Sequence, residues 1–178
     1  MNSYSFDEML SFSEGVVRGT CVDTIMEMLP GAVSVERAKL KDDKSGVDYW
    51  AHLRGGAVVG IDHKARTAGC SYFWKDGEPE FSLEVWSMIP DQLSQGKAGW
   101  TLSESSKTQY TLHTYDPSDT TRCFLLPFQL LRVAFRNNVK EWRQEYQVAR
   151  QSSGKWKSMC VFVPAYVVLK EIRKAMEK

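Results

Sequence analysis

The 178-residue sequence lacks the features of a membrane or secreted protein. No apolar run approaches the roughly 20 residues that a membrane-spanning helix needs. Residues 1–8 are polar and acidic, which is not typical of a signal peptide. We therefore expect a cytoplasmic protein that has no membrane partner.

Cysteine and histidine are scarce as well. Cys21, Cys70, Cys123 and Cys160 stand singly, no C-x-x-C pair is present, and the chain has three histidines. This pattern argues against a structural zinc site and favours reduced cysteines within the core. The sequence also has no glycine-rich phosphate loop and no Ser-His-Asp or Cys-His signature.

A strong net charge is the third absence. The formal net charge is +1, whereas many nucleic-acid-binding proteins are strongly basic. A local basic patch would still be enough for binding. Basic residues do gather in the last third of the chain, and solvated helix faces explain them as well as a binding surface does. They are Arg132, Arg136, Lys140, Arg143, Arg150, Lys155, Lys157, Lys170, Arg173, Lys174 and Lys178.

The residues that are present suit a single globular domain over residues 1–178, with 43% hydrophobic and 25% charged residues. Periodicity predicts a helix, then a block of strands, then helix, strand and helix. This order favours an α/β or α+β fold with helices on both sides of a central sheet. The predicted helices are residues 5–29, 128–146 and 164–176. The predicted strands are residues 32–40, 47–53, 57–65, 81–88, 108–115, 123–126 and 158–163.

The predicted strand at residues 57–65 ends in Asp62-His63-Lys64. Side chains alternate across a sheet, so Asp62 and Lys64 project from one face and His63 from the other. A carboxylate suits Mg²⁺, which prefers oxygen ligands, and a lysine can bind the attacking water or the phosphate charge. The pair therefore predicts a compact polar site.

Asp48, on the preceding strand, joins this pair only if the hairpin has the right register. A two-residue turn at Gly55-Gly56 would set Asp48 opposite His63, on the wrong face. A three-residue loop, residues 54–56, would set Asp48 opposite Asp62, and glycine suits the left-handed position that such loops use. We predict the odd-length loop or a bulge.

Two carboxylates and a lysine on one face indicate metal-assisted hydrolysis of a phosphodiester. The backbone carbonyl of His63, between the two site side chains, is a candidate further ligand. The alternative is a surface ion-pair cluster, because a D/E-x-K motif is weak by itself. A second copy of that motif occurs at residues 42–44 in a predicted loop.

In these residues the sequence resembles the PD-(D/E)XK nuclease superfamily. Asp48 matches the first acidic position, Val47 replaces the frequent proline, and Asp62 with Lys64 matches D/E-x-K. Residues 99–112 also look like the later strand region of some phage and bacterial members. The resemblance implies a restriction-endonuclease-like core, with a central mixed sheet flanked by helices.

The resemblance further implies cleavage of nucleic acid, DNA rather than RNA, with Mg²⁺ or Mn²⁺. Many members use a glutamate from the first helix, for which Glu14 is the local candidate, although a solvated helix glutamate explains it too. Glu84 and His52 are weaker candidates, and their alternatives are a plain exposed strand glutamate and a partly buried structural histidine. A homodimer is an open expectation. The alternative function is a catalytically silent nucleic-acid-binding or protein-interaction module on the same fold.

Overall fold

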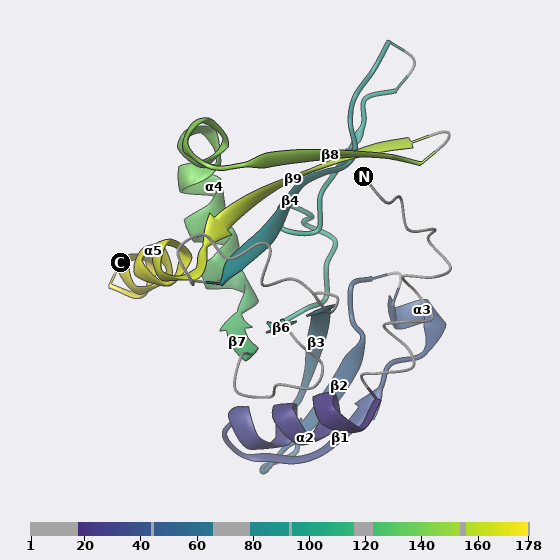
Figure 1. The fold of residues 1–178 in the computed structure, drawn as a ribbon. Helices are drawn as coiled ribbons and strands as arrows, with labels where there is room; N and C mark the ends of the chain where they lie inside the picture. Colours follow the sequence, from purple (N-terminus) through teal and green to yellow (C-terminus); the bar gives the residue numbers. More distant parts are fainter. Residues whose placement is uncertain are drawn as a thin grey trace. The chain divides into compact units, whose positions relative to one another are not determined.

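A computed structural model describes residues 18–43, 45–65, 79–92, 94–115, 123–153 and 156–177. The fold is mixed α+β, with strands in two sheets (Figure 1). The chain groups into two compact units. The first takes Met1–Cys70 with Thr108–Leu125, and the second takes Ser71–Lys107 with Leu126–Lys178. The single domain expected from the sequence stays a prediction.

The first unit is built on a five-stranded mixed sheet in the order β1-β2-β3-β6-β7. Strands β1, β2 and β3 form an antiparallel meander, and β6 lies parallel to β3. The elements are α2 (Arg18–Met28), β1 (Ala32–Arg37), α3 (Leu40–Asp43), β2 (Tyr49–Leu53), β3 (Val58–Ala65), β6 (Tyr110–Thr114) and β7 (Cys123–Pro127).

Helix α2 and the sheet share a hydrophobic core. Cys21 and Ile25 lie one turn apart on α2 and are buried against alternate residues of the strands, among them Ile61. Ile25 and Ile61 have no exposed surface. Burial of such a side chain contributes about 1.5–3 kcal/mol, so this contact fixes which face of the sheet α2 covers. The remaining buried members are Leu29, Tyr49, Ala51 and Leu112.

The hairpin between β2 and β3 has the predicted three-residue loop. Leu53 donates its backbone N–H to Ala57 O at 2.8 Å, which leaves residues 54–56 as the connection. Gly55 and Gly56 have φ of 103° and 89°, the left-handed region that favours glycine. The antiparallel ladder pairs Tyr49 with Ile61, so the next position along it sets Asp48 opposite Asp62. The predicted register is confirmed.

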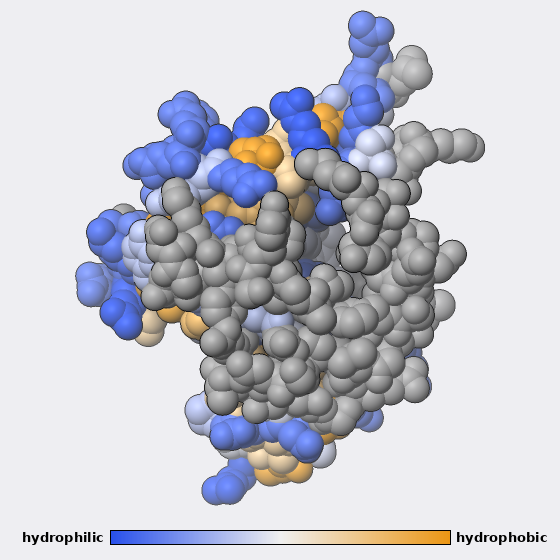
Figure 2. Space-filling model, in the orientation of Figure 1, coloured by the Kyte–Doolittle hydropathy of each residue, from blue (hydrophilic) through white to orange (hydrophobic). Residues whose placement is uncertain are grey.

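The second unit contains a four-stranded antiparallel sheet in the order β5-β4-β9-β8, with two helices. Helices α4 and α5 pack against each other and against β9, and hydrophilic side chains cover the outer side of α5 (Figure 2). Phe81, Leu83, Phe135 and Val161 are fully buried in this unit. The elements are β4 (Glu80–Met88), β5 (Lys97–Ala98), α4 (Phe128–Glu145), β8 (Val148–Ser153), β9 (Trp156–Pro164) and α5 (Ala165–Met176).

Three expectations about the fold are corrected. The strands form two sheets, so the single central sheet is wrong, because β4 pairs with the distant β9. Strand β8 was missed, since its polar sequence VARQSS has no apolar alternation. The predicted loop after residue 40 begins with α3. None of the helices in the described segments is both long and apolar enough to span a bilayer.

Candidate functional site

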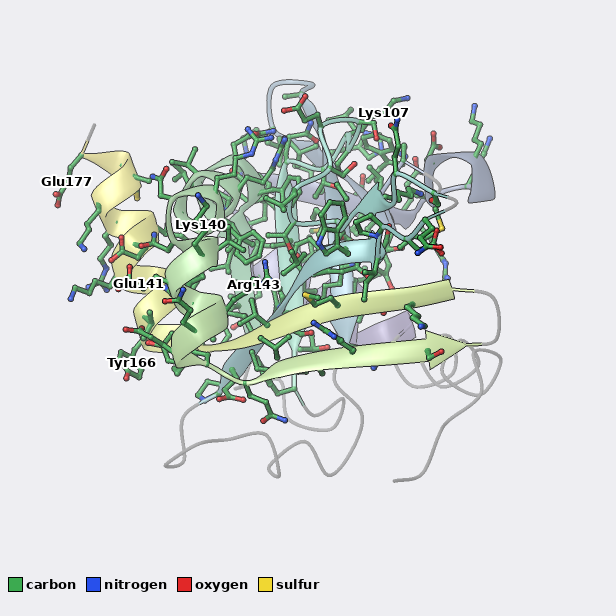
Figure 3. The ribbon with its side chains drawn as sticks, turned by 90° about the horizontal axis from the view of Figure 1, so that it is seen from above. Lys107, Lys140, Glu141, Arg143, Tyr166 and Glu177 are labelled. Atoms are coloured by element: carbon green, nitrogen blue, oxygen red, sulfur yellow. The ribbon has the colours of Figure 1, made fainter. Side chains whose placement is uncertain are left out.

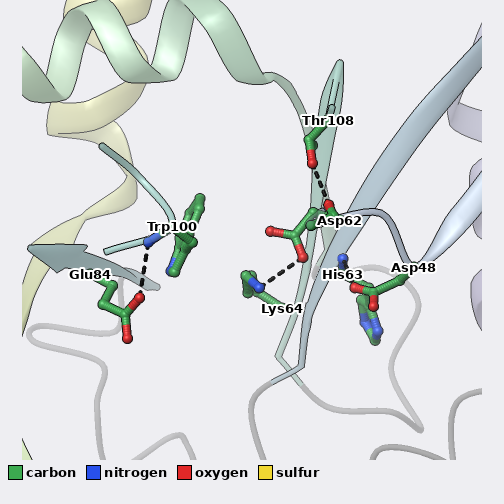
Figure 4. Close-up of polar contacts among 8 residues, drawn as sticks. Asp48, Asp62, His63, Lys64, Glu84, Trp100 and Thr108 are labelled. Atoms are coloured by element: carbon green, nitrogen blue, oxygen red, sulfur yellow. Dashed lines mark hydrogen bonds and ion pairs between the residues drawn. The ribbon is translucent and has the colours of Figure 1, made fainter. Parts of the chain in front are cut away.

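Asp62 and Lys64 form an ion pair on the face of β3 that turns away from α2. Lys64 Nζ donates to Asp62 Oδ1 at 2.7 Å (Figure 4). The Asp62 side chain is 6% exposed and the Lys64 side chain 34% exposed, so the carboxylate is buried and the ammonium reaches solvent. His63 points the other way, toward Cys21 of α2. The predicted alternation of these three side chains is confirmed.

Asp48 is held at the start of β2 by both neighbouring strands. Its backbone N–H donates to Ile61 O at 2.9 Å, and its carbonyl accepts the N–H of Ala38 at 2.8 Å. Its side-chain Oδ2 accepts the backbone N–H of His63 at 2.7 Å (Figure 4). The carboxylate thus takes the place that a strand carbonyl would fill in a regular ladder. The structure therefore brings Asp48 beside Asp62, as the register required.

The two carboxyl groups influence each other directly. Burial raises the pKa of Asp62 to about 7, and the Lys64 ammonium opposes this shift. The charge of Asp48 is a smaller cause of the same rise. With a pKa of about 7, the Asp62 carboxyl group is protonated below neutral pH.

Strand β6 adds two residues that sequence reasoning missed. The parallel ladder pairs Asp62 with Thr111 and Lys64 with His113, and both β6 residues are buried. Thr111 has no exposed surface, and its Oγ1 has no hydrogen-bond partner among the described residues. The alternation of residues 108–115 signalled a strand, but nothing in the sequence indicated that it pairs in parallel with β3.

A separate cluster lies on the α2 side of the sheet around His63. Its Nε2 lies 3.5 Å from Cys21 Sγ and 2.9 Å from Thr114 Oγ1. Burial lowers the pKa of His63 to about 4 and raises the pKa of Cys21 to about 12, so both are neutral near pH 7. An inert thiol and a neutral imidazole make this cluster part of the core. The predicted role of the His63 carbonyl as a metal ligand stays a prediction.

The remaining candidates are Glu14, Glu84 and His52. Glu14 lies outside the described residues. Glu84 belongs to the second unit, where its Oε2 accepts the backbone N–H of Trp100 at 2.9 Å (Figure 4). His52 lies near the hairpin loop, with its Nε2 3.4 Å from Glu36 Oε1. Glu84 is half-buried rather than plainly exposed, and the roles of Glu84 and His52 at the site stay predictions.

The site therefore combines two carboxyl groups, one ammonium and one hydroxyl on a single sheet face. Within the described segments, no group of three or more His, Cys, Asp or Glu side chains is placed to hold a metal ion. Comparisons with models of known families, with curated proteins and with solved structures found no match. The chemistry of this site is therefore the basis for the proposed function.

Proposed function

We propose that the chain is a metal-dependent nuclease that hydrolyses phosphodiester bonds, in DNA rather than RNA. The observation that carries the proposal is the convergence of Asp48 and Asp62 beside Lys64 on one sheet face. Like charges are rarely brought together in a buried place without a compensating cation. The resemblance to PD-(D/E)XK nucleases, which rests on these same residues, gives the reaction class.

The residues fit a hard divalent cation. Asp48, Asp62 and Thr111 offer only oxygen donors, the ligand type that Mg²⁺ and Mn²⁺ prefer. Asp48 and Asp62 would hold the cation, with the Thr111 hydroxyl as a further oxygen donor. When bound, the cation lowers the pKa of a coordinated water and neutralises charge on the phosphate.

Asp62, Lys64 and His63 would have different roles in the reaction. Asp62 must lose its proton before it can act as a ligand, and the nearby Lys64 ammonium favours that ionised form. Lys64 reaches solvent with a third of its side chain, so its Nζ is able to donate to an attacking water or a phosphate oxygen. The His63 N–H keeps the Asp48 carboxylate oriented through its 2.7 Å hydrogen bond.

The mixed sheet supports the proposal in a coarser way. An antiparallel meander followed by a strand parallel to its last member is compatible with a mixed-sheet nuclease core. Fold alone does not establish an activity, so the site carries the argument. A homodimer remains part of the proposal for substrates cut on both strands.

The decisive test is a cleavage assay on single-stranded, duplex and branched DNA and on RNA, with Mg²⁺, Mn²⁺ or EDTA. We expect metal-dependent cleavage of DNA that Asp62→Asn abolishes. Lys64→Met should lower kcat about 10²–10³-fold, the loss typical of one charge-stabilising donor. Asp42→Asn, in the second copy of the D-x-K motif on α3, is the matched control and should leave the rate unchanged.

The outcome against the proposal is equally concrete. Cleavage that persists in EDTA or in Asp62→Asn would reject the mechanism. Binding of DNA without cleavage of any substrate would favour the silent binding module. Calorimetric titration with Mn²⁺ separates these cases, because a metal site predicts binding in the wild type that Asp62→Asn weakens.

A further inference from the structure

Arg132, on α4 of the second unit, is a buried cation with little to balance its charge. The residue is 7% exposed. Its Nη1 lies 3.4 Å from Gln129 Oε1, a long contact, and its Nε has no hydrogen-bond partner among the described residues. The guanidinium carbon lies 5.6 Å from the ring centroid of Phe128, a cation–π contact. No carboxylate of the described residues forms an ion pair with it.

This arrangement is unfavourable for the protein alone. Buried charges in proteins are normally paired, and a cation–π contact offsets only part of the desolvation cost. Burial, helped by the like charge of Arg136, lowers the pKa of Arg132, and the charge of Glu104 opposes this shift to a smaller extent. Among the described residues, no carboxylate forms an ion pair that balances the Arg132 guanidinium.

The Glu104 carboxylate, which could balance a cation on α4, already forms an ion pair with the next basic residue, Arg136. Arg136 Nη2 donates to Glu104 Oε1 at 2.8 Å, and the two side chains are 46% and 82% exposed. Arg136 follows Arg132 by one helical turn on the same face. The pair thus runs from a buried guanidinium to a guanidinium at the solvent edge, with an exposed carboxylate beside the outer one.

The turn that carries Glu104 is held in place by backbone contacts. Leu102 and Ser103 both donate their N–H groups to Gly99 O at 2.9 Å. A Cβ atom on Gly99 would lie 2.2 Å from Glu84 O, so glycine is required for this close approach. The Trp100 ring stacks on Phe128 at 6.1 Å, which extends the layer beneath Arg132. Backbone hydrogen bonds and aromatic stacking therefore fix the turn beside the arginine pair.

We infer that Arg132 and Arg136 form a binding site for a phosphate group of a nucleic-acid backbone. A guanidinium offers paired N–H donors that match phosphate oxygens, which makes arginine the usual residue for this ligand. Glu104 occupies the outer arginine until the phosphate displaces it. The choice of nucleic acid as the phosphate source rests on the proposed function, whereas the need for an anion rests on Arg132 itself.

The first test measures binding of a fluorescent DNA duplex in EDTA, where no metal-dependent cleavage occurs. We expect Arg132→Met to weaken binding about tenfold and to reduce the slope of log affinity against log salt by about 1. Arg143→Met is the control, because Arg143 is exposed near the end of α4 (Figure 3) and should change affinity little. Arg132→Lys keeps the charge but loses the paired donors, so it should also weaken binding.

Glu104→Gln gives a test with the opposite sign. Removal of the competing carboxylate should tighten DNA binding by about 2–5-fold, in keeping with the strength of an exposed ion pair. Equal or weaker binding by this variant would contradict the displacement of Glu104.

The second test uses thermal unfolding without DNA. Because the buried Arg132 forms no ion pair with a carboxylate of the described residues, Arg132→Met should raise the Tm by about 2–4 °C while it weakens binding. Inorganic phosphate should raise the Tm of the wild type and not that of Arg132→Met. A lower Tm with unchanged DNA binding would show a structural arginine and overturn the inference. Protection by inorganic phosphate with DNA binding independent of Arg132 would overturn the nucleic-acid source.

Failure of the inference and failure of the proposed function are distinguishable. If cleavage depends on metal and Asp62 while Arg132→Met binds DNA like the wild type, the phosphate site is wrong and the nuclease stands. If DNA binding depends on Arg132 while the wild type cleaves no substrate with either metal, the nuclease is wrong and the phosphate site stands.

Discussion

Each of the two units buries a charged side chain, and the surroundings of the two charges differ. In the first unit, Asp62 is buried beside its opposite charge, with Lys64 Nζ at 2.7 Å. In the second unit, Arg132 is buried beside an aromatic ring and an amide. One charge is balanced within its own strand, and the other is balanced by no carboxylate of the described residues.

The difference shows how the surroundings of a buried charge bear on its function. Burial raises the pKa of Asp62, and the Lys64 ammonium offsets that burial only in part, while the charge of Asp48 adds a smaller rise. Arg132 has donors in excess, which is the condition for binding an anion. The comparison therefore assigns metal chemistry to the first unit and phosphate recognition to the second. The following experiments test this difference between the two units.

The largest expected effect is the pH dependence of stability that Asp62 contributes without metal. Its pKa is about 7 in the folded protein and 3.8 as a free side chain, so the folded state holds the proton more tightly. The stability that the Asp62 carboxyl group adds to the folded protein is fully present below about pH 4 and is lost as the pH rises through about 7. Three pKa units correspond to up to about 4 kcal/mol. Urea unfolding in EDTA from pH 4 to 8 measures this.

Asp62→Asn should flatten that pH profile, because the amide does not titrate. Glu36→Gln, which alters an exposed carboxylate of β1, is the control and should leave the wild-type slope in place. A profile that is the same for wild type and Asp62→Asn would contradict the raised pKa of the buried Asp62 carboxyl group.

The next effect comes from removing the partner of Asp62. Lys64→Met should lower the free energy of unfolding by about 2–3 kcal/mol at pH 8, below the range for fully buried pairs because Lys64 is 34% exposed. The loss should shrink at pH 5, where Asp62 is protonated. Lys174→Met breaks the more exposed pair with Glu171 and should cost under about 1 kcal/mol in the same denaturant titration. Equal losses of unfolding free energy in the two variants would contradict the burial of the Asp62–Lys64 ion pair.

A third effect concerns the turn that brings Glu104 to Arg136. Gly99→Ala places a Cβ 2.2 Å from Glu84 O and should destabilise the protein by about 2 kcal/mol through overpacking. Gly55→Ala is the matched variant in the first unit, with open space but φ of 103°, so its smaller cost of about 1 kcal/mol is conformational. Thermal unfolding compares them, and a harmless Gly99→Ala would contradict the close approach.

The smallest effect is at Thr111, the paired neighbour of Asp62. Thr111→Val should raise the free energy of unfolding by about 1 kcal/mol, because a buried hydroxyl without a partner is costly. The same change should weaken Mn²⁺ binding, whereas Thr111→Ser should retain it. Calorimetry of metal binding alongside urea unfolding gives both readouts. Loss of stability in Thr111→Val would mean that the hydroxyl is satisfied within the fold.

Part of the site could be predicted from local rules. Strand alternation placed Asp62 and Lys64 on one face, and the Gly55-Gly56 pair indicated the three-residue loop that sets Asp48 beside them. These features depend on neighbours within about 15 residues, where backbone geometry alone decides the outcome. Helices α4 and α5 and most of the strands were predictable for the same reason.

The rest depended on contacts between distant segments. The parallel pairing of β3 with β6 brings Thr111 beside Asp62 across 49 positions of sequence, and the pairing of β4 with β9 creates the second sheet. Strand periodicity does not specify a partner, so both were missed. Arg132 was only one basic residue in a list, because its burial depends on what packs around α4.

The sequence by itself determined the local chemistry: a carboxylate and an ammonium two residues apart on a strand, and a hairpin that adds a second carboxylate. Only the tertiary structure decided what those charges experience. Burial raised the pKa of Asp62, β6 supplied the hydroxyl beside it, and the packing of α4 enclosed Arg132 next to Phe128. The physical reason is that charge and spacing are properties of the chain, whereas desolvation depends on everything packed around the charge.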